Sequence, residues 1–146
     1  MFFSSRILAP LALAALATPA LATTIDHQVP SPQGALQLRY TPEMTLSVSQ
    51  RGLGPREMPR CAWKTSYALE RTVTRADGAV IAPLARVTPL AEPQSGMSTG
   101  SCAKVRREMA NGGALPETIR SLAKAEAARD ARQFETELPQ LLAMTP

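Results

Sequence analysis

Apolar and polar side chains alternate most clearly between Arg60 and Thr74, and this alternation predicts a β-strand. The larger apolar side chains of the segment share one parity: Cys61, Trp63, Tyr67, Leu69 and Val73. Charged and hydroxyl side chains occupy most of the positions between them. Successive side chains of a strand point to opposite faces, so one face of this strand is expected to pack against a core.

Two shorter alternating runs precede this segment. In the first, Leu36, Leu38 and Tyr40 alternate with polar residues, and in the second Met44, Leu46 and Val48 alternate with hydroxyl side chains. The tripeptide 41–43 contains a proline and is expected to turn the chain between them. We therefore predict a hairpin formed by two short strands.

After the long strand, Asp77 and Gly78 predict a tight turn, because both residue types tolerate positive φ. Pro83 interrupts the returning strand, which ends near Leu90 and is expected to lie at a sheet edge or to break into two pieces. The following segment 91–100 is expected to be a loop.

Two helices are predicted after this loop. Ser101 is a natural N-cap for a helix from Cys102 to about Ala110, which residues 111–113 would end. The second helix begins at about Pro116. Its buried stripe is expected at spacings of three and four: Ile119, Leu122, Ala123, Ala127, Ala131, Phe134 and Leu138. Pro139 is expected to end or kink this helix.

Charges of both signs alternate on the other face of the second helix. They are Arg120, Lys124, Glu126, Arg129, Asp130, Arg132 and Glu135. Mixed charges of this kind are typical of a solvated helix surface.

The predicted fold class is α+β, with an antiparallel sheet of about four strands and two C-terminal helices packed on one of its faces. Residues 34–146 are expected to form one domain, strand-rich over 34–90 and helical over 101–142. A polar segment with two prolines, residues 23–33, is expected to be an extended N-terminal arm. The alternative is a small sandwich or open barrel with the long helix appended.

The first 22 residues resemble a secretory signal peptide. Arg6 precedes an apolar run, and small side chains at Ala20 and Ala22 fit a signal peptidase cleft. The apolar run contains Pro10 and is too short to span a bilayer, so no stable membrane insertion is expected after processing. We predict cleavage after Ala22 and a periplasmic or secreted location.

Cys61 and Cys102 are the two cysteines of the chain. An exported chain with an even number of cysteines meets an oxidising compartment, so we predict one disulfide between them. The alternative is a redox-active thiol at Cys102, where the start of a helix would stabilise a thiolate.

The formal net charge of +4 is spread evenly along the sequence. A nucleic-acid partner is not expected without a basic patch, whereas an envelope protein or an anionic envelope polymer is compatible with a small positive surplus. Arg51, Arg56 and Arg60 flank or lie in a glycine-containing loop that could bind an anion or simply connect two strands. Trp63 could offer an exposed platform to a sugar ring or pack beside Cys61.

Residue types that carry catalysis are scarce. His27 is the single histidine, it lies in the proline-rich arm, and the sequence has no Gly-x-Ser-x-Gly nucleophile motif. One histidine cannot build a multi-histidine metal site, the scattered methionines form no copper site, and no nucleotide-binding glycine pattern follows a strand, so neither a metal nor another cofactor is expected. The sequence favours a non-catalytic envelope or secreted binding module. The alternatives are a small periplasmic hydrolase, a thiol oxidoreductase, or an inhibitor that presents the loop Arg51–Arg60 to an exported enzyme.

Overall fold

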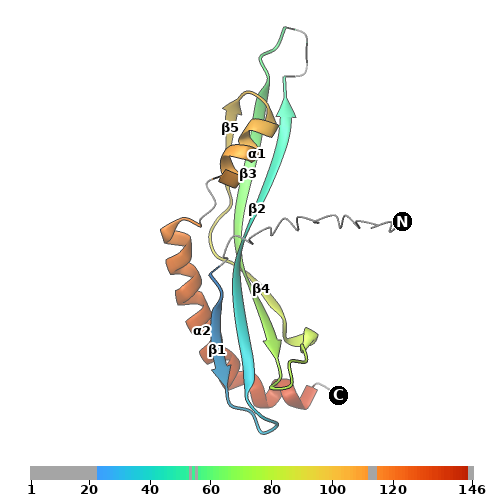
Figure 1. Ribbon diagram of the computed structural model, residues 1–146, viewed down its shortest axis with the longest axis vertical. Coiled ribbons are helices and arrows are strands. Elements are labelled where there is room, and N and C mark those ends of the chain that lie inside the picture. Colours follow the sequence, from blue (N-terminus) through green and yellow to red (C-terminus); the bar gives the residue numbers. More distant parts are fainter. Residues whose placement is uncertain (1–22, 53, 55, 112–114, 145–146) are drawn as a thin grey trace, which may run out of the picture.

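A long antiparallel hairpin forms the spine of the molecule (Figure 1). The computed structural model describes residues 23–52, 54, 56–111 and 115–144, so the expected signal peptide lies outside the described residues. Strand β2 (Leu36–Arg51) pairs with β3 (Arg60–Thr74) in one unbroken register from Gln37 opposite Thr74 to Arg51 opposite Arg60. The hairpin is therefore continuous from one end of the molecule to the other.

Three short strands complete the sheet. Strand β1 (Ile25–Val29) pairs with the start of β2, while β4 (Arg86–Pro89) and β5 (Gln94–Thr99) follow one another along the opposite edge of β3. We call the part with β1 and β4 the proximal half. The part with β5 and the loop 52–59 is the distal half.

The helices cover different halves of the hairpin. Helix α1 (Cys102–Asn111) lies beside the distal half and α2 (Glu117–Met144) beside the proximal half (Figure 1). Ser101 caps α1 as expected, because its hydroxyl accepts the Lys104 N–H at 3.3 Å. The structure thus confirms an α+β fold with an antiparallel sheet, the C-terminal helix on the sheet and one disulfide.

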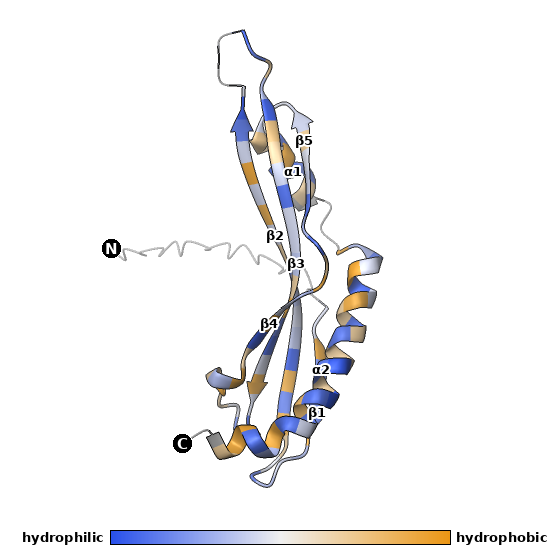
Figure 2. Ribbon diagram, turned by 180° about the vertical axis from the view of Figure 1, so that it is seen from behind, coloured by the Kyte–Doolittle hydropathy of each residue, from blue (hydrophilic) through white to orange (hydrophobic). Residues whose placement is uncertain are grey.

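The main core lies between α2 and the proximal half. Even-numbered residues of β2 and odd-numbered residues of β3 face the helix, as strand alternation requires. The buried apolar side chains include Leu36, Leu38, Tyr40, Leu69, Val73, Ala123, Ala127, Ala131, Phe134 and Leu138. Figure 2 shows the corresponding banding of apolar and polar residues along α2 and the strands. The predicted helix stripe is confirmed except at Leu122, which is 45% exposed.

The prediction of a turn at residues 41–43 is wrong, because β2 runs through Pro42 as a single strand. The Tyr67 carbonyl accepts the Leu90 N–H and the Val73 carbonyl accepts the Ile81 N–H, so odd-numbered residues of β3 direct their backbone groups away from β2. The β2 residues opposite them are even-numbered, and they direct their own N–H and C=O groups away from β3. Pro42 is one of these, so its missing N–H interrupts no bond to β3.

Two segments that were expected to lie outside the sheet contain strands of it. The segment 91–100 contains β5, where Gly96 lies opposite Trp63. A Cβ atom at position 96 would lie 2.5 Å from the Trp63 ring, so the glycine lets the ring cross the edge strand. The arm 23–33 contains β1, which is extended as expected but belongs to the sheet, with Val29 only 3% exposed.

The turn at Asp77 and Gly78 is present. Of the two residues only Gly78 has a positive φ, at +84°, and the Arg75 N–H donates to the Ala79 carbonyl, so the loop spans residues 76–78 and not Asp77 and Gly78 alone. The Asp77 carboxylate accepts the Ala79 N–H. The returning chain breaks into an isolated bridge at Val80, a 3₁₀ helix η1 (Ala82–Leu84) and β4, as Pro83 predicts.

Helix α2 does not end at Pro139 but continues to Met144. Leu138 is buried, and Leu141 and Leu142 pack against the core beyond the proline. Burial of apolar side chains on both sides of Pro139 stabilises this last stretch, where proline removes one backbone hydrogen bond.

Candidate functional site

The distal end of the hairpin brings together two of the three arginines singled out from the sequence. Arg51 ends β2 and Arg60 begins β3, and the two residues are direct cross-strand partners. Side chains of such partners lie on the same face of the sheet. Ala62 and Met97, which are partners between β3 and β5, share that face. Because two like charges placed directly opposite each other are unfavourable, this pair concentrates positive charge at some cost in stability.

Gly52 is the first residue of the loop that follows β2. It has a φ of +69°, and a Cβ atom there would lie 2.6 Å from the Met58 carbonyl oxygen. A side chain at position 52 would therefore be strained and would collide with the backbone. The close approach holds the chain at Met58 against the end of β2.

An open hollow of about 660 Å³ results at this end of the molecule. We call it the distal hollow, and its lining residues are Arg51, Gly52, Glu57, Met58, Arg60, Ala62 and Met97. Met58 is 74% and Met97 60% exposed, and unbranched methionine side chains adapt readily to an apolar partner.

The charge of the distal hollow is positive, since two arginines face one glutamate. Neither Arg51 nor Arg60 forms an ion pair with another described residue. Arg56 is exposed in the loop but does not line the hollow. Free guanidinium groups beside exposed methionines can bind a surface that offers carboxylates next to an apolar group.

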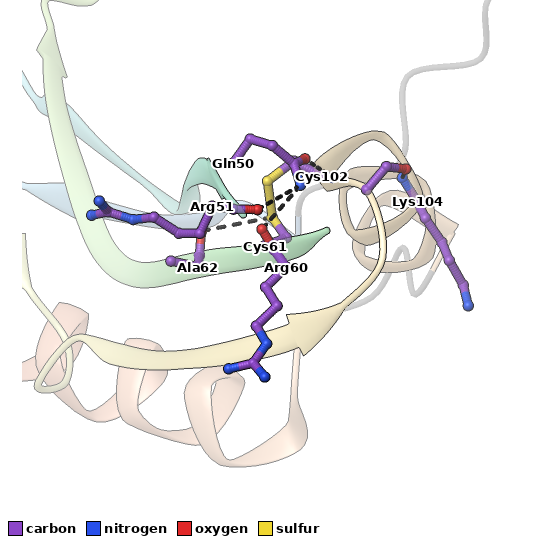
Figure 3. Close-up of a disulfide and its surroundings, with 8 residues drawn as sticks. Gln50, Arg51, Arg60, Cys61, Ala62, Cys102 and Lys104 are labelled. Atoms are coloured by element: carbon purple, nitrogen blue, oxygen red, sulfur yellow. Dashed lines mark hydrogen bonds between the residues drawn. A yellow bond between two sulfur atoms is a disulfide. The ribbon is translucent and has the colours of Figure 1, made fainter. Parts of the chain in front are cut away.

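The disulfide lies next to the strand ends that carry Arg51 and Arg60 (Figure 3). Cys61 and Cys102 are bridged, with Cα atoms 5.0 Å apart, and Cys61 is fully buried. The Gln50 side chain accepts the Cys102 N–H at 3.0 Å and donates to the Arg60 carbonyl at 3.0 Å. The bridge and Gln50 together tie the start of α1 to both strands at the point where they carry Arg51 and Arg60.

Trp63 lies on the opposite face of the sheet from the distal hollow. It shares the parity of Cys61, is partly buried, and its ring lies against the backbone of Gly96. The structure therefore does not bring Trp63 together with the arginines.

A second cluster, buried in the proximal half, escaped the sequence analysis. The Asp130 carboxylate accepts hydrogen bonds from the Tyr40 hydroxyl at 2.8 Å and from Arg71 at 2.7 Å. Arg71 also donates to the Leu84 carbonyl, and its guanidinium lies over the Phe134 ring at 4.8 Å. We call Tyr40, Arg71 and Asp130 the buried triad.

Asp130 was expected on the solvated face of α2, and this expectation is wrong, because the residue is only 6% exposed. Its carboxylate is held by Arg71 and Tyr40, with Arg86 3.5 Å away at the margin. No described buried side-chain polar atom lacks a hydrogen-bond partner. The polar side-chain atoms of the buried triad thus bond to one another and to the Leu84 carbonyl, and they link the sheet, α2 and η1.

Burial raises the pKa of the Tyr40 hydroxyl well above its ordinary value, and the hydrogen bond to Asp130 raises it further. His27 lies edge-on to the Tyr40 ring, with centroids 5.8 Å apart. The single histidine therefore packs against the buried triad at the β1 side of the core.

Comparison of the chain with protein-family models, with curated proteins and with solved structures gives no match. Within the described ranges, neither helix combines the length and the apolar character needed to cross a membrane.

Proposed function

We propose that this protein is an exported, non-catalytic binding module and that the distal hollow is its contact surface. The observation that carries the proposal is the gathering of Met58 and Met97, both largely exposed, with the unpaired cations of Arg51 and Arg60 in one hollow. Exposed apolar side chains next to arginine are typical of interaction surfaces.

The partner that fits this surface best is a protein that presents acidic side chains around an apolar group. An anionic polymer would satisfy the arginines but would leave the methionines without a counterpart. The first 22 residues and the bridge between Cys61 and Cys102 support export, because disulfides persist in oxidising compartments.

Two variants test the proposal by capture of partners from the envelope fraction of the native host. Replacement of Arg51, Arg56 and Arg60 by alanine removes the cations, and Met58→Ser with Met97→Ser removes the apolar contact. We expect each variant to lose most of the captured partner, and we expect wild-type capture to weaken as salt rises.

The matched control replaces Arg75, Arg107 and Arg132, which are exposed elsewhere, with alanine. It loses the same three positive charges, so capture equal to that of the wild type is expected. Unchanged capture by both hollow variants would reject the distal hollow as the contact surface. Loss in the arginine variant alone would indicate an anionic polymer instead of a protein.

A further inference from the structure

Beyond Tyr40, β2 has an unpaired edge. Strand β1 covers only residues 36–40 of β2, and no described strand pairs with the remaining residues on that side. Figure 1 and Figure 2 both show β2 as the free margin of the distal half, with β5 on the other side of β3.

The backbone groups of this edge are available for pairing. The even-numbered residues of β2 direct their N–H and C=O groups away from β3, so Met44, Leu46, Val48 and Gln50 offer theirs to the free edge. Residues 44–50 include no charged residue, proline or glycine. Natural edge strands usually carry such residues to prevent pairing with another chain.

The charges that flank this edge are complementary to each other. Glu43 precedes the uncharged stretch and Arg51 follows it, both are exposed, and neither forms an ion pair with a described residue. In an antiparallel pair of two copies centred on Ser47, Glu43 of each copy lies opposite Arg51 of the other.

Only this register uses all the free groups. It places Met44 opposite Gln50 and Leu46 opposite Val48, so each residue meets a partner that also directs its backbone groups outward. A register shifted by two residues would place Gln50 opposite Pro42, which has no N–H, or Met44 opposite Gly52, outside the strand. A shift by one residue would set each residue that directs its backbone groups outward opposite one that directs them toward β3, so the two edges could not exchange hydrogen bonds.

We propose that two copies of this chain associate through their β2 edges, antiparallel about Ser47, with Glu43 and Arg51 paired across the interface. The two sheets then form one continuous sheet, and the two distal hollows point in opposite directions. The dimer does not require the proposed function, but Arg51 takes part in both proposals: paired with Glu43 of the other copy, it leaves Arg60 as the unpaired cation of the distal hollow.

The first experiment measures mass by analytical ultracentrifugation of the chain expressed with its own N-terminal segment, over a dilution series. We expect the mass of two chains for the wild type and of one chain for Glu43→Arg and for Arg51→Glu, because each places like charges opposite each other. The double variant Glu43→Arg with Arg51→Glu should regain the dimer. A monomeric wild type, dimeric single variants or a monomeric double variant would overturn the proposal.

A second measurement does not depend on the charges. Ser47→Cys places two thiols opposite each other at the centre of the proposed interface, whereas Thr45→Cys places its two thiols four residues out of register. With the bridge between Cys61 and Cys102 intact, mild oxidation should cross-link the first variant and not the second. Equal cross-linking of both variants, or none in Ser47→Cys, would overturn the proposed register.

Discussion

At the residue scale, the most consequential interactions are those of the buried triad. The side chains of Arg71 and Asp130 are 10% and 7% exposed, so each charge depends on the other for compensation. Removal of one partner leaves an uncompensated charge in the interior, which is far more costly than replacement of both.

We therefore expect Asp130→Ala to lower the free energy of unfolding by about 3–5 kcal/mol. The double variant Arg71→Met with Asp130→Leu removes both charges and should be distinctly more stable than Asp130→Ala. Chemical denaturation monitored by circular dichroism measures both. Equal stability of Asp130→Ala and the wild type would show that the pair is not compensating a buried charge.

The raised pKa of Tyr40 predicts a loss of stability in alkaline solution. The unfolded chain releases the phenol proton near the ordinary tyrosine value of about 10, whereas the folded chain keeps it. The contribution of Tyr40 is thus fully present below about pH 10 and falls as pH rises further. Tyr40→Phe should be less stable than the wild type at neutral pH but should lose less stability above pH 10, as measured by denaturation at several pH values. If the free energy of unfolding of the wild type and of Tyr40→Phe fell equally with pH above 10, the raised pKa of Tyr40 would be contradicted.

At the element scale, α1 depends on its covalent link. Among its described side chains only Val105 is well buried, at 4% exposure, and the main core lies in the other half of the molecule. The disulfide and the Gln50 contact therefore hold this helix on the sheet.

Replacement of both cysteines by alanine is expected to lower the free energy of unfolding by about 2–4 kcal/mol, since the bridge closes a long loop. Hydrogen exchange should accelerate in α1 and β5 more than in α2, because α2 keeps its packing on the core. A uniform change over all elements would indicate that the molecule unfolds only as a whole.

The elements differ in how far their sequences predicted them. The long alternation of β3 and the stripe of α2 follow from local pattern, and the pairing of Cys61 with Cys102 was predicted from the even cysteine count and the expected export. Strand β5 and the passage of β2 through Pro42 do not, because they depend on which edge of a neighbouring strand is free. The composition of a segment carries no information about that edge.

At the scale of the whole molecule, each site is built from segments that lie far apart in the sequence. Arg51 and Arg60 were expected near one loop, but the methionines completing the hollow come from two segments 39 residues apart, Met58 and Met97. Asp130 looked like a surface charge because its partners lie 59 and 90 positions away in the sequence. Only the folded topology brings these residues together.

The unbroken register of β2 and β3 has a consequence for the reach of the protein. Each strand residue advances about 3.3 Å, so β2 spans roughly 50 Å. The distance between the half packed by α2 and the loop 52–59 is therefore set by the number of residues in β2 and β3. Removal of two residues from each strand would shorten this distance by roughly 7 Å and leave every side chain on its present face of the sheet. Removal of one residue from each strand would move the side chains beyond the deletion to the opposite face.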